Sequence, residues 1–125
     1  MAARGSTKKP TMLTAEAILS KNDLEERIID VPEWGGAVKI RALGKRLYND
    51  ITQNAKVRGE LDEFKFEMGL LQAGIVEPSF TLDQIGQLQE KSVGAVDRVV
   101  SEIMEISGLT TRMMAAFEAA FRDES

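Results

Sequence analysis

The chain has 125 residues, of which 43% are hydrophobic and 29% charged, and this composition is typical of one soluble globular domain. It contains no cysteine and no histidine, which excludes disulfides and thiolate chemistry and removes the commonest general base and metal ligand. The net charge of −4 disfavours nucleic acid as the main partner. No apolar run approaches the length of a membrane span or resembles a secretory signal, so we expect a cytoplasmic protein.

Residues 1–13 are predicted to be a disordered arm, because they are small and polar and lack an apolar period. Arg4, Lys8 and Lys9 make the arm basic, with no acidic residue beside them. A basic arm can contact a partner or nucleic acid, but an unstructured terminus without such a role is the commoner case.

A short helix is predicted over residues 15–21. Thr14 has the side chain and the position of its N-cap. The apolar residues Ile18 and Leu19, together with Leu24, are expected to pack onto the element that follows.

A β-hairpin is predicted over residues 26–43. In its second strand apolar and charged residues alternate with a period of two, which indicates a half-buried strand, and the inward set is Val38, Ile40 and Ala42. In its first strand the residues on one face are Arg27, Ile29 and Val31, while Ile28 breaks the alternation.

The turn of the hairpin is marked by Pro32, Gly35 and Gly36. The two glycines are expected to supply the positive φ of a tight turn, and the proline fixes its entry. Trp34, the only tryptophan, lies in this turn. It is either tucked onto the body or offered to a partner as an anchor, and the sequence favours neither.

A helix with one basic face is predicted from Gly44 to Gly59. Its apolar stripe is Leu47, Tyr48, Ile51, Ala55 and Val57, and its basic face is Lys45, Arg46, Lys56 and Arg58. The basic face invites a nucleic-acid interpretation, but it lacks interleaved aromatic residues, so a solvated face is favoured.

The next helix is predicted from Glu60 to Gly74, and Pro78 prevents its continuation. Its expected core stripe is Leu61, Phe64, Met68, Leu71 and Ile75. Glycines inside the predicted helices indicate close packing or local plasticity and not a ligand site; they are Gly69, Gly86 and Gly94.

A capping box, Thr81 with Gln84, begins a short helix over residues 82–91, and Phe80 and Ile85 have the spacing of a hydrophobic staple. The inward residues are expected to be Leu82, Ile85 and Leu88. Ser92 is a candidate second cap, and whether the helix breaks there or continues stays open. The core stripe of the longer helix that follows is Val93, Val96, Val99, Val100, Ile103 and Met104.

A last helix is predicted to begin at Thr110 or Thr111, after a break at Ser107-Gly108. Its apolar face is Leu109, Met113, Met114, Phe117 and Phe121. Methionine-rich faces adapt to several partners, although closing the domain's own core is the favoured role of this one. Residues 122–125 should fray.

The predicted fold is therefore α+β and mainly α. An N-terminal short helix and one β-hairpin precede a bundle of four to five helices. Residues 14–121 form a single globular domain, with the hairpin at about 26–43 and the helical body at 44–121.

Catalytic chemistry is not indicated by any motif. Without histidine, no serine or threonine has the usual base, and the adjacent acids Asp62 and Glu63 point in different directions on a helix. The pair Gly35-Gly36 is too short for a phosphate-binding loop. We predict no enzyme, no cofactor and no metal ion.

Several motifs together resemble one family. The segment Val31–Leu43, Val-Pro-Glu-Trp-Gly-Gly-Ala-Val-Lys-Ile-Arg-Ala-Leu, resembles the V-P-E-W-G-G-x-V-x-V-R-x-L hairpin of tail assembly chaperones of long-tailed bacteriophages and prophages. The segment Gly74–Pro78 is similar to the family's G-x-x-D/E-P element, and Ile106–Leu109 resembles the break before its last helix. The resemblance covers residues 14–121.

The resemblance implies that the protein binds the tape measure protein, keeps its apolar helical stretches soluble and helps to recruit tail tube protein. It also implies absence from the mature virion and no catalytic residues. The candidate partner-binding residues are Trp34, Met113, Met114, Phe117 and Phe121, and the protein is a possible homo-oligomer. Two other hypotheses stay open, a small structural or adaptor protein of the virion and a DNA-binding regulator.

Overall fold

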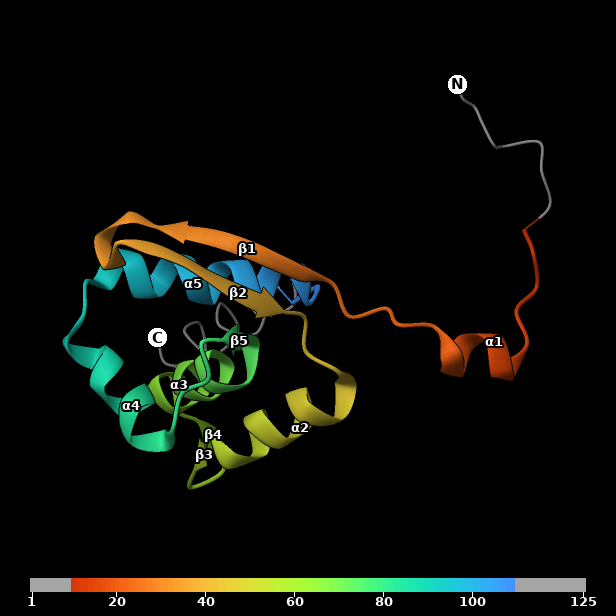
Figure 1. The fold of residues 1–125 in the computed structure, drawn as a ribbon. Coiled ribbons are helices and arrows are strands. Elements are labelled where there is room, and N and C mark those ends of the chain that lie inside the picture. Colours follow the sequence, from red (N-terminus) through yellow and green to blue (C-terminus); the bar gives the residue numbers. More distant parts are fainter. Residues whose placement is uncertain (1–9, 110–125) are drawn as a thin grey trace.

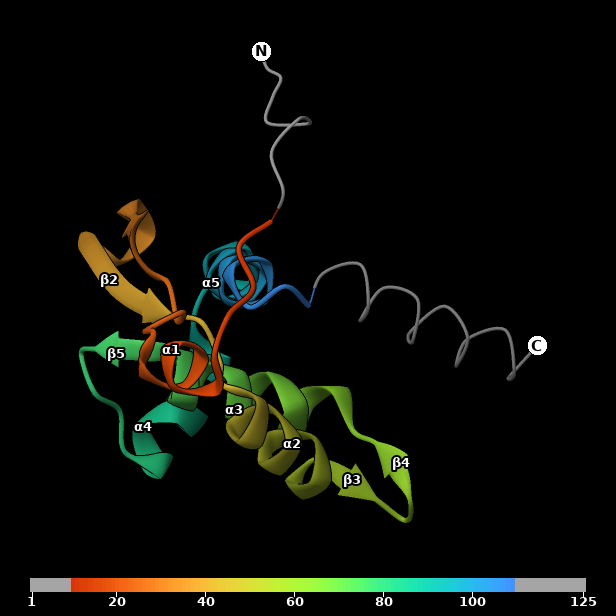
Figure 2. The ribbon, with the colours of Figure 1, turned by 90° about the vertical axis from the view of Figure 1, so that its right-hand side faces the viewer.

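A three-stranded antiparallel sheet forms one layer of the protein (Figure 1). The computed structural model describes residues 10–109. Strands β1 (Glu26–Val31) and β2 (Gly36–Arg41) form a hairpin, and β5 (Ile75–Glu77) pairs with the other edge of β2. Helix α5 (Val93–Ile106) runs along one face of this hairpin, as both figures of the ribbon show (Figures 1 and 2).

The helices below the sheet are arranged around α3 (Glu63–Gly74), which contacts α5 and the two remaining body helices. These are α2 (Lys45–Asn54) and α4 (Leu82–Gln87), and α4 continues as the 3-10 helix η3 (Leu88–Glu90). A second hairpin, β3 (Lys56–Val57) with β4 (Glu60–Leu61), projects beyond α2 and α3 (Figure 2). The fold is thus a mixture of helices and a small sheet.

The predicted β-hairpin is confirmed. In β1 and β2 the inward residues are buried, and Ile29 lies opposite Val38 in the register. Ile28 interrupts the apolar pattern because its side chain lies on the exposed face. The turn is a 3-10 turn, η2 (Pro32–Trp34), closed by Gly35 at φ +79°. The expectation that both glycines have positive φ is wrong, because Gly36 belongs to the extended strand.

Ion pairs fix this hairpin to α5. The Arg27 guanidinium contacts Glu102 at 2.6 Å and Glu105 at 3.1 Å. At the turn, Arg98 and Glu33 form a bidentate pair with distances of 2.9 and 2.7 Å. The hydrogen bonds from Arg98, with a smaller contribution from the backbone, lower the pKa of Glu33 to about 2. Strand β1 and the turn of the hairpin are therefore attached to α5 by charge as well as by apolar packing.

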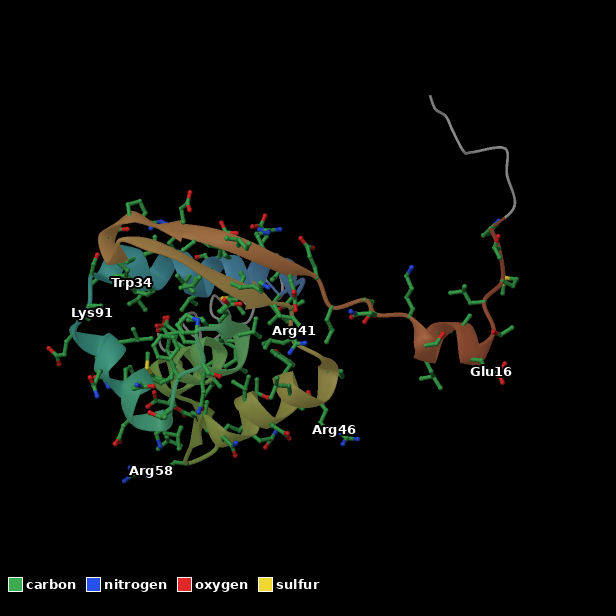
Figure 3. All side chains as sticks on the ribbon, in the orientation of Figure 1. Glu16, Trp34, Arg41, Arg46, Arg58 and Lys91 are labelled. Carbon is green, nitrogen blue, oxygen red and sulfur yellow. The ribbon has the colours of Figure 1, made fainter. Side chains whose placement is uncertain are left out.

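The basic helix is shorter than predicted, because α2 ends at Asn54. Arg58 at φ +55° and Gly59 at φ +83° make the two-residue turn that closes the β3–β4 hairpin. Lys56 and Arg58 therefore lie on this hairpin and not on a helix. In Figure 3, Arg46 and Arg58 are found at opposite ends of α2, so the predicted basic helical face does not form.

The buried face of α3 also differs from the prediction. The helix begins one residue after its N-cap Asp62, and its buried residues are Phe66, Leu70, Leu71 and Gly74. Phe64 is exposed, Met68 is half-buried, and Ile75 leaves the helix to pair with Ile40 in the sheet. The C-terminal end of α3 packs closely against α5. A Cβ atom added to Gly74 would lie 2.6 Å from Ile103 Cδ1.

The capping box at Thr81 is confirmed, with Gln84 and Thr81 bonded reciprocally at 3.0 and 3.2 Å. The open question about Ser92 is answered, because the chain breaks there and Ser92 caps α5. The core residues of α5 are Ala95, Val96, Val99, Val100 and Ile103. The prediction that Leu82 and Val93 belong to the core is wrong. Both lie in the first turns of their helices and face solvent.

Helix α1 (Ala15–Ser20) forms as predicted, and the Ala17 N–H donates to the Thr14 hydroxyl at 3.1 Å. The prediction that its apolar residues pack onto the hairpin is wrong. Ile18 and Leu19 are exposed, and the helix lies away from the body at the end of an extended segment (Figure 1). A six-residue helix has too little apolar surface to close on the sheet, whose inner face α5 already covers.

Candidate binding groove between α2, α3 and α4

An apolar groove of about 660 Å³ lies between α2, α3 and α4. Its lining from α2 is Leu47, Asp50, Ile51 and Asn54, and from α4 it is Leu82 and Ile85. The contribution of α3 is Phe64, Lys65, Met68, Gly69, Gln72 and Ala73. The volume is in the range of sites that hold several side chains of a partner or a small ligand.

The floor of the groove depends on the close approach of α2 to α3. A Cβ built on Gly69 would lie 2.8 Å from Ile51 Cγ2, so a larger residue would push the two helices apart. The interpretation of this helical glycine as a packing position is confirmed. Gly86 has no neighbour within 4 Å of such a Cβ, so the same interpretation is wrong there.

Aromatic packing in the core holds together two of the helices that line the groove. Tyr48 on α2 meets Phe66 on α3 edge to face, with 6.5 Å between ring centroids. The Lys45 ammonium lies 5.7 Å from the centroid of the Tyr48 ring. The ring contact joins α2 to α3, the two helices that supply most of the groove lining.

Several apolar residues that line the groove are unusually exposed. The side chains of Leu47, Phe64 and Leu82 are 42%, 46% and 75% exposed. Singly exposed apolar residues are ordinary, but three that line one concavity form a patch, and such patches mark interaction surfaces. Asp50 and Lys65 place one negative and one positive charge at the rim. An apolar floor with polar rims is the form that accepts an amphipathic helix.

The apolar surface continues across α3. Phe64 and Met68 also line a neighbouring hollow of about 280 Å³, which reaches Val93 and Val96 on α5. Glu67 lies beside it, and partial burial, followed by the charges of Glu63 and Asp97, raises the pKa of its carboxyl. This carboxyl group therefore places a titratable side chain at the edge of the apolar surface.

Trp34, predicted as a candidate partner anchor, is tucked against the core. It is half-buried, and its indole Nε1–H is buried without an acceptor among the residues that the structure describes. Trp34 lines a separate hollow of about 520 Å³ with Phe80 and Leu88, near Lys91 (Figure 3). It takes no part in the groove. The other candidates, Met113, Met114, Phe117 and Phe121, lie outside the described residues.

The groove was missed because its large apolar residues were assigned to buried stripes. One sequence signal pointed to them. Within α3, the apolar side chains of Phe64, Phe66, Met68, Leu70 and Leu71 are more than a single helical face can bury. Such an excess indicates a helix with one face in the core and a second apolar face elsewhere.

No protein-family model matches the chain, and neither curated proteins nor solved structures gave a significant match. Between residues 10 and 109, acidic side chains do not gather in groups of three or more that could hold a metal ion. In the same range, helices long and apolar enough to cross a membrane are absent. The α2–α3–α4 groove is lined mainly by apolar side chains, so the chemistry it offers a partner is apolar contact.

Proposed function

We propose that this chain is a tail assembly chaperone of a long-tailed bacteriophage or prophage. In this proposal the α2–α3–α4 groove binds apolar helical segments of the tape measure protein and keeps them soluble. The chaperone also helps to recruit tail tube protein during tail assembly. It works by binding and not by catalysis, in the cytoplasm of the host cell, and it is absent from the finished virion.

The groove is the observation that carries the proposal. A tape measure protein is a long helical chain with apolar faces, and an isolated helix of that kind must cover its apolar stripe to stay soluble. Apolar side chains spaced three and four residues apart would enter the groove between Leu47 and Leu82, over Gly69. The motifs of the hairpin, which resemble the chaperone family, support the same proposal from a different part of the chain.

A chaperone must accept many segments of one long partner, and the lining of the groove supports this requirement. Met68 has a flexible and polarizable side chain that can adjust to different shapes. Phe64 and Leu82 are held on one side only, so their rotamers can change without disturbing the core. The terminal face with Met113, Met114, Phe117 and Phe121 stays a prediction for a second binding surface.

Co-expression with the tape measure protein of the same tail gene cluster tests the proposal. We expect the wild-type chain to raise the soluble fraction of the tape measure protein and to co-purify with it. The double variant Phe64→Glu with Leu82→Glu should lose both effects, because it puts two charges into the apolar groove. The matched control is Ile28→Glu, which changes an exposed apolar residue on the sheet and should leave both effects unchanged.

Three outcomes would contradict the proposal. One is a tape measure protein that stays insoluble and does not co-purify with the wild-type chain. Another is equal binding by the groove variant and the control, which would move the binding surface away from the groove. The third is stoichiometric presence of the chain in purified virions, which would favour the virion adaptor protein.

A further inference from the structure

The segment Met12–Ser20 carries apolar side chains that nothing in the described chain covers. Met12 and Leu13 are 86% and 66% exposed, and Ile18 and Leu19 on α1 are 55% and 85% exposed. Helix α1 has no buried residue. An isolated helix of six residues is unstable in water by itself, and burial of its apolar side usually supplies the missing stabilisation. Burial of this segment's apolar side chains against a partner surface would therefore stabilise the helix.

The root of the segment is fixed to the body and limits where α1 can go. The Ala42 N–H donates to the Glu25 carbonyl at 2.8 Å, and Leu24 is half-buried beside Gly44. Only residues 21–23 remain as a tether, with a reach of about 10 Å. Figure 1 shows α1 on the far side of this tether from the sheet and the helical body, and Glu16 points away from them in Figure 3. The apolar side chains of the segment are thus exposed to solvent and accessible to another molecule.

The same chain offers a surface that matches the segment. Of the large apolar residues exposed on the body, Leu47, Phe64 and Leu82 line one groove. Two branched aliphatic side chains of a short helix fit an apolar concavity of about 660 Å³. The groove lining includes one acid and one base, Asp50 and Lys65, and α1 carries Glu16 in its first turn and Lys21 at its C-cap.

Charge favours the same pairing over a longer range. Residues 1–13 contribute three positive charges to a chain whose net charge is −4, so the remainder of the chain carries −7. A basic arm and an acidic body attract each other when they belong to different copies. This attraction between arm and body adds to the apolar contact between the two copies.

We propose that the Met12–Ser20 segment of one copy docks in the α2–α3–α4 groove of a second copy. The contact is head to tail, because the donor surface and the acceptor surface are different parts of the chain. Each molecule that accepts a segment still presents its own, so repetition gives a ring or an open polymer. This inference does not rest on the chaperone function and holds for any function of the groove.

A mixing experiment tests the proposal. The donor-deficient variant combines Ile18→Glu with Leu19→Glu, and the acceptor-deficient variant combines Phe64→Glu with Leu82→Glu. All four residues are exposed, and circular dichroism with urea unfolding verifies that both variants remain folded. Sedimentation velocity over a concentration series should show self-association of the wild-type chain, and each variant alone should sediment as a 13.8 kDa monomer.

An equimolar mixture of the two variants gives the decisive result. The intact segment of one variant can enter the intact groove of the other. The resulting complex has neither an intact free segment nor an intact free groove, so it cannot grow. We therefore expect the mixture to form a discrete 1:1 complex of twice the monomer mass, with no larger species. The control Ile28→Glu should associate like the wild type.

Any of three results would overturn the proposal: a wild-type chain that stays monomeric, a mixture that stays monomeric, or loss of association in Ile28→Glu. A monomeric wild type whose residues 10–24 resist proteolysis would indicate docking within one molecule. Capture of the tape measure protein is measured separately on the same variants. If self-association fails but capture of the tape measure protein is intact, the head-to-tail contact is wrong and the proposed function is unaffected. If capture fails but self-association is observed, the proposed function is wrong and the head-to-tail contact is unaffected.

Discussion

The hairpin with α5 and the groove with α1 use their apolar residues in opposite ways. In the first region the inward residues of β1 and β2 are covered by α5, and ion pairs at Arg27 and Glu33 attach β1 and the hairpin turn to the helix. In the second region apolar residues of comparable size, such as Phe64 and Leu19, face solvent. Every ion pair found between residues 10 and 109 involves the hairpin or the residue before it.

This difference separates stability from binding within a small chain. A surface that is already packed and paired has little left to offer a partner, whereas an apolar surface without a cover is available for one. Helix α3 belongs to both regions, because one of its faces is in the core and the other lines the groove. Substitutions on its two faces should therefore have different consequences.

The largest expected effect comes from two phenylalanines two residues apart on α3. Phe66 is 1% exposed and packs edge to face on Tyr48, so Phe66→Ala should lower the free energy of unfolding by about 3–5 kcal/mol. Phe64→Ala removes a side chain of a residue that is 46% exposed, and we expect a loss of less than about 1 kcal/mol. Urea unfolding followed by circular dichroism measures both.

Equal losses for the two variants would contradict the division of α3 into a core face and a groove face. A large loss for Phe64→Ala alone would mean that the groove is closed by part of the chain in solution. In that case α1 or another segment of the chain would bury the side chain of Phe64.

A second comparison uses two helical glycines. Gly74→Ala places a methyl group 2.6 Å from Ile103 Cδ1, and we expect a destabilisation of about 1–3 kcal/mol from overpacking between α3 and α5. Gly86→Ala places the same group in open space within α4, and it should stabilise by up to about 1 kcal/mol through helix propensity. Thermal unfolding of the two variants beside the wild type gives the signs, and equal signs would contradict the packing described here.

The smallest expected effect is the pH dependence that Glu33 confers. Its pKa is lowered from 4.5 to about 2 in the folded chain, chiefly by the hydrogen bonds from Arg98. The folded state therefore holds this proton more weakly than the unfolded state. The stabilisation is present above pH 4.5 and is lost as the pH falls from about 4.5 to about 2.

Glu33→Gln removes this titration, so its stability should change less with pH over that window than the stability of the wild type. Urea midpoints measured between pH 2 and pH 6 compare the two profiles. Parallel profiles would indicate that the pair at the hairpin turn does not persist in solution. Ile28→Gln, on the exposed face of the same hairpin, is a control that leaves the ion pair intact.

The features predicted correctly from the sequence depend on neighbouring residues. The caps at Thr14 and Thr81 and the hairpin strands all follow from hydrogen bonds or alternation within a few positions. Such interactions are decided by local geometry and do not need the rest of the fold. The break before Ser92 was left open, because an uninterrupted helix and a capped restart have similar local sequences.

The features predicted incorrectly depend on contacts between distant residues. Ile75 fits a helical stripe, but pairing with Ile40 places it in the sheet. Val57 likewise fits the stripe of α2, although the turn at Arg58 directs it into a strand. The groove could not be predicted, because an apolar period indicates a face that is covered and does not reveal by which molecule.

The chain carries a single tryptophan and a single tyrosine, and the fold places them in different regions. Trp34 is packed at the hairpin turn with its Nε1 shielded, while Tyr48 packs against Phe66 between α2 and α3, the two helices that line the groove. Each region therefore has its own intrinsic chromophore. Tryptophan emission and the near-ultraviolet signal of tyrosine can follow the two regions through one melting curve without any label. Coincident curves would mean a single cooperative unit, and an earlier tyrosine transition would mean that the groove opens while the hairpin stays folded.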